Sequence, residues 1–237
     1  GGAVCLDGIK NLIYNCTFKD NEALYFAGAI DIYGKSNTID NCTFENVSSS
    51  KNAGALFADA YLAENMPVTI TNSTFVDCYS GFGGAILALG ANINIENCNF
   101  KDNTVLFDGG AIYASHSVIA ISNSTFDGNG GYGSVVDRDS YGGAIYGDDG
   151  TLNMHDSQLI NNFAQTGSAI YLYDSNYDFE FGGGVYKKSN DGMNEYREYT
   201  FVITDTNSEE TRSGSVICSA AGSIGNPFGK YDISLIM

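Results

Sequence analysis

The chain has 237 residues, of which 28 are acidic and 11 are basic, so its formal net charge is −17. So large a negative charge disfavours nucleic acid and anionic membrane surfaces as partners. The sequence has no run of about 18 apolar residues, so we expect no membrane insertion within this segment.

Two motifs recur along the first 170 residues at nearly the same interval. Tetrads related to Gly-Gly-Ala-Ile occupy positions 1–4, 27–30, 53–56, 83–86, 109–112, 142–145 and 167–170. Blocks related to Asn-Cys/Ser-Thr-Phe begin at Asn15, Asn41, Asn72, Asn97 and Asn123. Repeats of about 26 residues indicate supersecondary units stacked in a solenoid.

Each repeat contains short β-branched runs with alternating polarity, as at 68–70, 93–95 and 119–121. This pattern is typical of strands, and no segment shows a sustained helical period. We therefore predict an all-β fold, a right-handed parallel β-helix of about eight rungs of about 26 residues, forming one domain over residues 1–237.

Alignment of the repeats predicts columns of like residues inside the coil. We expect one column of large apolar residues at Phe18, Phe44, Phe75, Phe100, Phe126 and Leu159, and a second at Ile13, Ile39, Ile70, Ile95, Ile121 and Met154. The column that begins at Asn15 should form turns, because Asn tolerates the left-handed backbone conformation. Cys16, Cys42 and Cys98 alternate with serines in one column, which predicts small buried free thiols.

The segment after residue 167 departs from the repeat. The next tetrad-like sequence is at 214–217, and residues 231–236 resemble a following strand, so we expect further rungs there and a chain that is part of a longer protein. The intervening residues predict an inserted, Tyr-rich excursion at about 174–200. The candidate ligand-binding residues in and beside this segment are Tyr171, Tyr173, Tyr177, Tyr186 and Tyr196. Tyrosine suits both recognition and the packing of a hairpin against the coil, so both interpretations stay open.

Four aspartates are candidate calcium ligands: Asp137, Asp139, Asp148 and Asp149. Calcium prefers clustered carboxylate and carbonyl oxygens, but the spacing of these residues matches neither an EF-hand nor the calcium-binding nonapeptide repeats. The simpler interpretation is that the acidic surface keeps an extended protein soluble. We therefore expect no obligatory cofactor and treat calcium as an alternative.

The tetrad, together with Phe-x-x-Asn at 18–21, 100–103 and 126–129, resembles the repeats of two groups of surface proteins. These are the adhesin-like surface proteins of methanogenic archaea and the polymorphic outer-membrane proteins of chlamydiae. The acidic composition and the Asn-Cys/Ser-Thr-Phe block are more similar to the archaeal group. Phe-x-x-Asn is absent from two rungs, which carry Val47 and Cys78. The resemblance implies a pectate-lyase-like β-helix, an extracellular location at the cell surface, and attachment to a glycan or protein of another cell; it transfers no catalytic residue.

Two alternatives compete with an adhesin. A polysaccharide lyase needs a basic residue beside carboxylates, and only Arg138 between Asp137 and Asp139 offers this. A hydrolase needs two opposed carboxylates, whereas Asp148 and Asp149 are adjacent in a glycine-flanked turn. We therefore expect a protein that is not an enzyme. The other alternative is a surface stalk that binds nothing.

Overall fold

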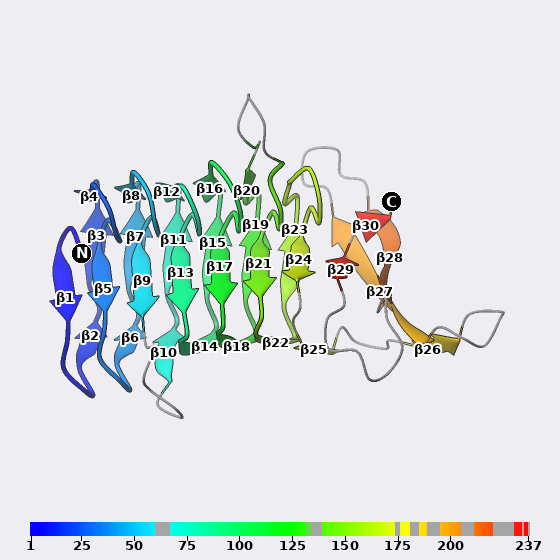
Figure 1. Cartoon of the computed structure of the whole chain (residues 1–237), viewed down its shortest axis with the longest axis horizontal. Helices are drawn as coiled ribbons and strands as arrows, with labels where there is room; N and C mark the ends of the chain where they lie inside the picture. The colour runs from blue at the N-terminus through cyan, green and yellow to red at the C-terminus, as the bar shows by residue number, and fades with distance from the viewer. Residues whose placement is uncertain are drawn as a thin grey trace.

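The computed structural model describes residues 1–59, 67–131, 133 and 139–173 with their side chains, and six further strands by their backbone. The described part consists of strands and turns and contains no helix. The strands form a parallel coil with its turns side by side along the long axis, and the N-terminus lies at one end of the coil (Figure 1).

Two sheets run the length of the coil. Sheet A consists of β1 (Val4–Leu6), β5 (Ile30–Ile32), β9 (Leu56–Asp59), β13 (Ile86–Leu89), β17 (Ile112–Ser115), β21 (Ile145–Asp148), β24 (Ile170–Tyr173) and β29 (Lys230–Ile233). Sheet B consists of β2 (Leu12–Tyr14), β6 (Thr38–Asp40), β10 (Val68–Thr71), β14 (Asn92–Glu96), β18 (Val118–Ser122), β22 (Thr151–His155) and β25 (Asn176–Glu180). All pairs in these two sheets are parallel except that of β24 with β29.

Two shorter sheets complete each turn of the coil. Sheet C consists of β3 (Thr17–Lys19), β7 (Thr43–Glu45), β11 (Thr74–Val76), β15 (Asn99–Lys101), β19 (Thr125–Asp127) and β23 (Gln158–Ile160). Sheet D consists of β4 (Glu22–Ala23), β8 (Ser48–Ser49), β12 (Tyr79–Ser80), β16 (Thr104–Val105) and β20 (Gly130–Gly131).

The coil has about six turns, so the expectation of about eight rungs is too high. The difference arises after β25. A separate antiparallel sheet contains β26 (Val185–Lys188), β27 (Glu195–Thr204), β28 (Thr211–Ser219) and β30 (Leu235–Ile236). The tetrad-like segment 214–217 lies in β28, which pairs antiparallel with β27, so the expectation that it opens a new rung is wrong. Likewise, β29 pairs antiparallel with β24.

The Tyr-rich segment 174–200 begins within the coil. Its first strand, β25, pairs parallel with β22 and continues sheet B. Its next strands, β26 and the start of β27, pair with each other as an antiparallel hairpin. Residues 174–175, 181–184 and 189–194 lie outside the described part of the chain.

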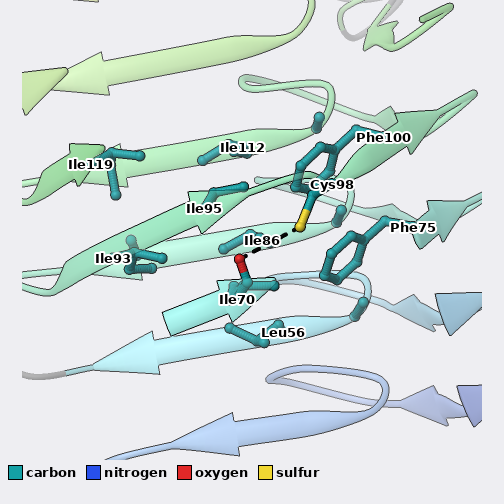
Figure 2. Close-up of a cluster of buried hydrophobic side chains, with 14 of the residues drawn as sticks. Leu56, Ile70, Phe75, Ile86, Ile93, Ile95, Cys98, Phe100, Ile112 and Ile119 are labelled. Atoms are coloured by element: carbon teal, nitrogen blue, oxygen red, sulfur yellow. Dashed lines mark hydrogen bonds between the residues drawn. The ribbon is translucent and has the colours of Figure 1, made fainter. Parts of the chain in front are cut away.

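The predicted core columns are confirmed. Rings of Phe18, Phe44, Phe75, Phe100 and Phe126 stack with centroids 4.6–4.9 Å apart and planes within 7° of parallel. Isoleucines of sheets A and B fill the space beside them, and Ile86, Ile93 and Ile112 point into the same interior (Figure 2). Each column repeats because parallel pairing places equivalent residues directly opposite each other, as in Phe75 with Phe100. Stacks of like side chains fill the interior densely and fix the register.

The glycines of the tetrad are explained by close backbone contact. A Cβ built on Gly110 would lie 1.9 Å from the carbonyl oxygen of Gly143 in the next turn, so no side chain fits there. The residue before it, Gly109, has φ of +72°, a conformation that glycine adopts without strain. The alanine that follows is buried in every turn after the first, as Ala111 is, whereas Ala3 at the end of the coil is exposed. The tetrad therefore brings neighbouring turns close together before each sheet A strand.

The turn column that begins at Asn15 has the predicted left-handed conformation. Asn15, Asn41, Asn72, Asn97, Asn123 and Asp156 all have φ between +48° and +53°. The amide of Asn41 donates to Asn15 Oδ1 at 3.0 Å, as expected for stacked amides, whereas the amide of Asn72 donates to Asp40 Oδ1 at 2.8 Å. The turns are therefore held both by their backbone and by bonds between turns.

The five cysteines with described side chains are free, as predicted for the column of Cys16, Cys42 and Cys98. Cys42 and Cys98 are buried as expected, whereas Cys16, in the first turn, is only half-buried. In the cysteine and serine column, the backbone N–H of Cys98 donates to Ser124 Oγ at 3.1 Å, and Cys98 Sγ donates to the Ile70 carbonyl at 3.6 Å (Figure 2). Burial raises the pKa of Cys98 to about 11 and that of Cys78 to about 12. These thiols therefore stay protonated and belong to the packing of the core.

A ladder of buried asparagines explains the Phe-x-x-Asn motif. Asn103 and Asn129 are fully buried, and Asn162 is nearly so. Asn129 Oδ1 accepts from the backbone N–H and the side-chain amide of Asn103, at 3.1 and 2.8 Å. Asn162 Oδ1 accepts the equivalent two bonds from Asn129. Buried polar groups need such partners, so the ladder satisfies backbone groups at the turn between sheets C and D.

Candidate functional site

The outer face of sheet A over β17, β21 and β24 brings several of the predicted site residues together. Along each strand, alternate residues point into the core and away from it. Ile145 and Gly147 are covered by the coil, so Tyr146 and Asp148 lie on the outside. In register with them are Tyr113 and Ser115 on one side and Tyr171 and Tyr173 on the other. We call these residues the outer face; they form an aromatic column and a polar column. The strands that carry them, β17, β21 and β24, lie side by side (Figure 1).

The aromatic column is a stack of tyrosines along the coil. The rings of Tyr113 and Tyr146 are 4.8 Å apart and within 13° of parallel, and those of Tyr146 and Tyr171 are 5.6 Å apart and within 12°. The ring of Tyr141, from the segment before β21, has its centroid 4.8 Å from that of Tyr171. Tyr171, which is also flanked by β29, is only 4% exposed, and Tyr113 and Tyr146 are half-buried. The stacked rings of this column form a closed surface, and a ligand has little access to the flat sides of the rings.

The environment of Tyr146 in the middle of the aromatic column keeps its phenol neutral. Burial raises the pKa of the Tyr146 phenol above its usual value, and the nearby Tyr113 and Asp148 raise it further. A phenol in such a place stays protonated and can donate a hydrogen bond.

The polar column is more accessible. Tyr173 is 49% exposed, and it stands in register with Asp148, which is half-buried. Ser115 is almost covered and donates to Asp148 Oδ2 at 3.4 Å. The three strands thus present a hydroxyl, a carboxylate and a phenol in successive turns of the coil.

The turn after β17 adds a histidine, and the turn after β21 adds a second carboxylate. His116 and Asp149 both have positive φ, which turns the chain from sheet A to sheet B. His116 Nε2 lies 3.1 Å from Asp149 Oδ2, and His116 Nδ1 lies 2.9 Å from Ser115 Oγ. The side chains of His116 and Asp149 are 55% and 60% exposed, so water competes with this pair.

The other predicted site residues lie elsewhere. Tyr177 is in β25 of sheet B, opposite Leu152, and Tyr186 and Tyr196 are in the antiparallel strands β26 and β27. The structure describes only the backbone of these three tyrosines. Asp139 is exposed and precedes β21, whereas Asp148 ends that strand. Asp137 lies outside the described residues.

No metal centre is formed by the residues that the structure describes. Among them, no group of three or more His, Cys, Asp or Glu side chains could hold a metal ion. Asp148 and Asp149 are instead engaged with Ser115 and His116 of the preceding turn. Calcium at a site that includes Asp137 stays a prediction.

Sequence analysis selected Tyr173, Asp148 and Asp149 for separate reasons and missed Ser115 and His116. A positional signal was present: Ser115, Asp148 and Tyr173 each lie three residues after the last residue of a tetrad, at Ile112, Ile145 and Ile170. Counting from the tetrad therefore identifies residues that share one column of the outer face.

Comparison with known protein families agrees with this architecture. Residues 2–184 match the family described as the right-handed beta helix region, and the chain therefore belongs to that family. The match confirms the predicted all-β, right-handed parallel β-helix.

Two curated proteins share sequence similarity with the chain. One is the probable autotransporter YfaL of Escherichia coli (strain K12), which is 30% identical over 194 residues, covering 72% of this chain and 14% of that protein. The other is metabotropic glutamate receptor-like protein R of Dictyostelium discoideum, which is 30% identical over 89 residues, covering 38% of this chain and 5% of that protein. The chain thus spans a small part of both relatives. No solved structure gives a significant match. In the described residues, no helix is long and apolar enough to cross a membrane.

Proposed function

We propose that this chain is part of an extracellular cell-surface protein of the adhesin-like kind, which attaches to another cell or a host surface through the outer face of sheet A. The observation that carries the proposal is the convergence of Tyr173, Asp148 and His116 at one accessible edge of a rigid coil. Binding residues are commonly held on such a scaffold, because a stacked coil fixes their spacing.

Three further observations support this proposal. The chain belongs to the right-handed β-helix family, and one of its relatives is named as a probable autotransporter. The net charge of −17 suits a protein that stays soluble while exposed to solvent. The repeat motifs also resemble those of methanogen adhesin-like proteins and chlamydial outer-membrane proteins.

We propose that the outer face binds and does not catalyse. Asp148 and Asp149 are neighbours in the chain, and each contacts a side chain of the preceding turn. Glycoside hydrolysis needs two carboxylates on opposite sides of the bond that is cut. A lyase needs a base that faces the substrate, and β17, β21 and β24 contain no lysine or arginine. The imidazole of His116 at this edge is paired with Asp149 through Nε2 and with Ser115 through Nδ1, so we propose that it holds a ligand in place. Incubation with polysaccharides should release no new reducing ends and no unsaturated products.

The proposal is tested by attachment to cells. The 237-residue chain is coupled to fluorescent beads, and bead binding is counted on a panel of bacterial, archaeal and epithelial cells. We expect binding to at least one cell type, reduced by Tyr173→Ala. Tyr79→Ala is a matched control, because Tyr79 is similarly exposed at 40% but lies in β12 of sheet D. If the beads bound none of the cell types, this result would contradict the proposal and favour a stalk.

A further inference from the structure

We infer that the accessible edge of the outer face is a binding site for an uncharged glycan, with a sugar ring against Tyr173 and its hydroxyl groups bonded to Asp148 and to the His116–Asp149 pair. This inference rests on the proposed function and names the class of ligand for that surface. It places recognition on the coil itself, at the junction of sheets A and B (Figure 1).

Accessibility locates the ring-binding position. In the aromatic column, Tyr146 is covered by neighbouring rings on both sides, and Tyr171 is 4% exposed. Tyr173 is 49% exposed and follows Tyr171 by two residues on the same side of β24. An exposed tyrosine gives a large contact area at low entropy cost, and its ring suits the apolar face of a sugar.

The polar groups beside Tyr173 match the chemistry of sugar hydroxyls. Asp148 and Asp149 supply carboxylate oxygens that accept hydrogen bonds, and His116 carries a ring nitrogen that donates or accepts. A sugar hydroxyl both donates and accepts, so it can bond a carboxylate and an imidazole together. Asp149 and His116 are 3.1 Å apart, which allows one hydroxyl to contact both groups.

Charge determines which glycans fit. The edge contains two carboxylates, and β17, β21 and β24 contain no lysine or arginine. The neighbouring strand β29 contributes one basic residue, Lys230, in register with Tyr173, so carboxylates still outnumber basic residues here. An acidic sugar would bring a third carboxylate close to Asp148 and Asp149, and like charges repel strongly at short distance. The site should therefore favour uncharged sugars over uronic acids or sulfated sugars.

The same surface is poorly suited to a protein partner. Protein interfaces are dominated by clusters of buried apolar and aromatic anchors. Of the large apolar side chains that are exposed in the described residues, only Tyr173 lies on β17, β21 or β24. A single exposed aromatic residue among polar groups is sufficient for one sugar ring but offers little to a protein surface.

Binding of defined oligosaccharides to the 237-residue chain tests the inference. The probes are hexasaccharides of glucose, mannose, galactose and N-acetylglucosamine, with hexagalacturonate as the acidic counterpart, measured by biolayer interferometry and titration calorimetry. We expect at least one uncharged probe to bind and hexagalacturonate to bind at least about tenfold more weakly.

Three variants test the named residues. Tyr173→Ala should weaken binding of the uncharged probe at least about tenfold, whereas Tyr79→Ala should leave it unchanged. Asp148→Asn keeps the shape of the side chain and removes its charge. It should therefore reduce the difference in affinity between the uncharged probe and hexagalacturonate. Thermal unfolding by circular dichroism establishes that each variant retains the fold.

The results also separate this inference from the proposed function. The inference is overturned if no uncharged probe binds, if hexagalacturonate binds more tightly, or if Tyr173→Ala has no effect in a folded protein. If the beads attach to cells but bind none of the probes, adhesion stands and the glycan site does not. If the probes bind through Tyr173 but no cell is bound, the glycan site stands and the proposed adhesion fails.

Discussion

The buried asparagine ladder gives a quantitative test of how the coil is held together. Asn129 makes four side-chain hydrogen bonds: two accepted from Asn103, one donated to the Phe100 carbonyl at 3.0 Å, and one donated to Asn162 at 2.9 Å. Replacement with valine is sterically reasonable, because Val47 is the equivalent residue of an earlier turn and is fully buried. The main effect of Asn129→Val is therefore the loss of hydrogen bonds.

The size of the effect follows from the groups left without partners. The backbone N–H and the side-chain amide of Asn103 both lose their acceptor on Asn129 in a fully buried environment. Each buried donor without its partner costs about 1–3 kcal/mol, so two donors cost about 2–6 kcal/mol. Burial of the valine methyl groups offsets about 1 kcal/mol of this. We expect the free energy of unfolding to fall by about 3 kcal/mol.

Urea denaturation of the whole chain, followed by circular dichroism, measures this change. Asn153→Val is the control, because Asn153 is half-buried on sheet B and its change should stay within about 0.5 kcal/mol. If Asn129→Val were as stable as the parent to within about 1 kcal/mol, the ladder would not satisfy buried groups as we argue.

Three other outcomes follow from the packing. Phe75→Ala opens the middle of the phenylalanine stack and should lower the free energy of unfolding by about 3–5 kcal/mol in urea; a loss below about 1 kcal/mol would contradict the stacked core. Gly110→Ala should destabilise the coil by about 1–3 kcal/mol, because the new Cβ meets the Gly143 carbonyl, and an unchanged thermal midpoint would refute this contact. Iodoacetamide at pH 8 should modify the exposed Cys5 and leave Cys78 intact until urea is added, because burial raises the Cys78 pKa to about 12; peptide mass mapping that found native Cys78 modified would oppose its burial.

The same thiols predict how stability depends on pH. A cysteine in the unfolded chain loses its proton near pH 8.5, whereas folded Cys98 and Cys78 lose theirs near 11 and 12. Between these values the folded state binds more protons than the unfolded state, so stability is complete below about pH 8.5 and decreases as pH rises. Cys78→Ala should weaken this decrease in urea titrations between pH 8 and 10, and an identical pH profile would contradict the assignment.

The sequence determined the coil because each turn repeats its contacts with the next. The positions of Phe75 and Phe100 in their motifs predicted that the two rings stack, and parallel pairing places them opposite each other. Gly110 and the turn at Asn97 were predictable for the same reason, since a local backbone requirement recurs in every turn. A repeat of about 26 residues carries this information many times over.

Only the tertiary structure decided where the repeat ends and which outward residues meet. The segment 214–217 has the tetrad pattern, yet it pairs antiparallel with β27, because a short motif does not specify the strand beside it. Asp148, Tyr173 and His116 come from different turns and differ in residue type, although Asp148 and Tyr173 stand at the same distance from their tetrads. Strand register and the turn between sheets A and B bring these residues to one edge. Outward positions vary in residue type from turn to turn, because the packing that keeps the core columns alike does not act on them.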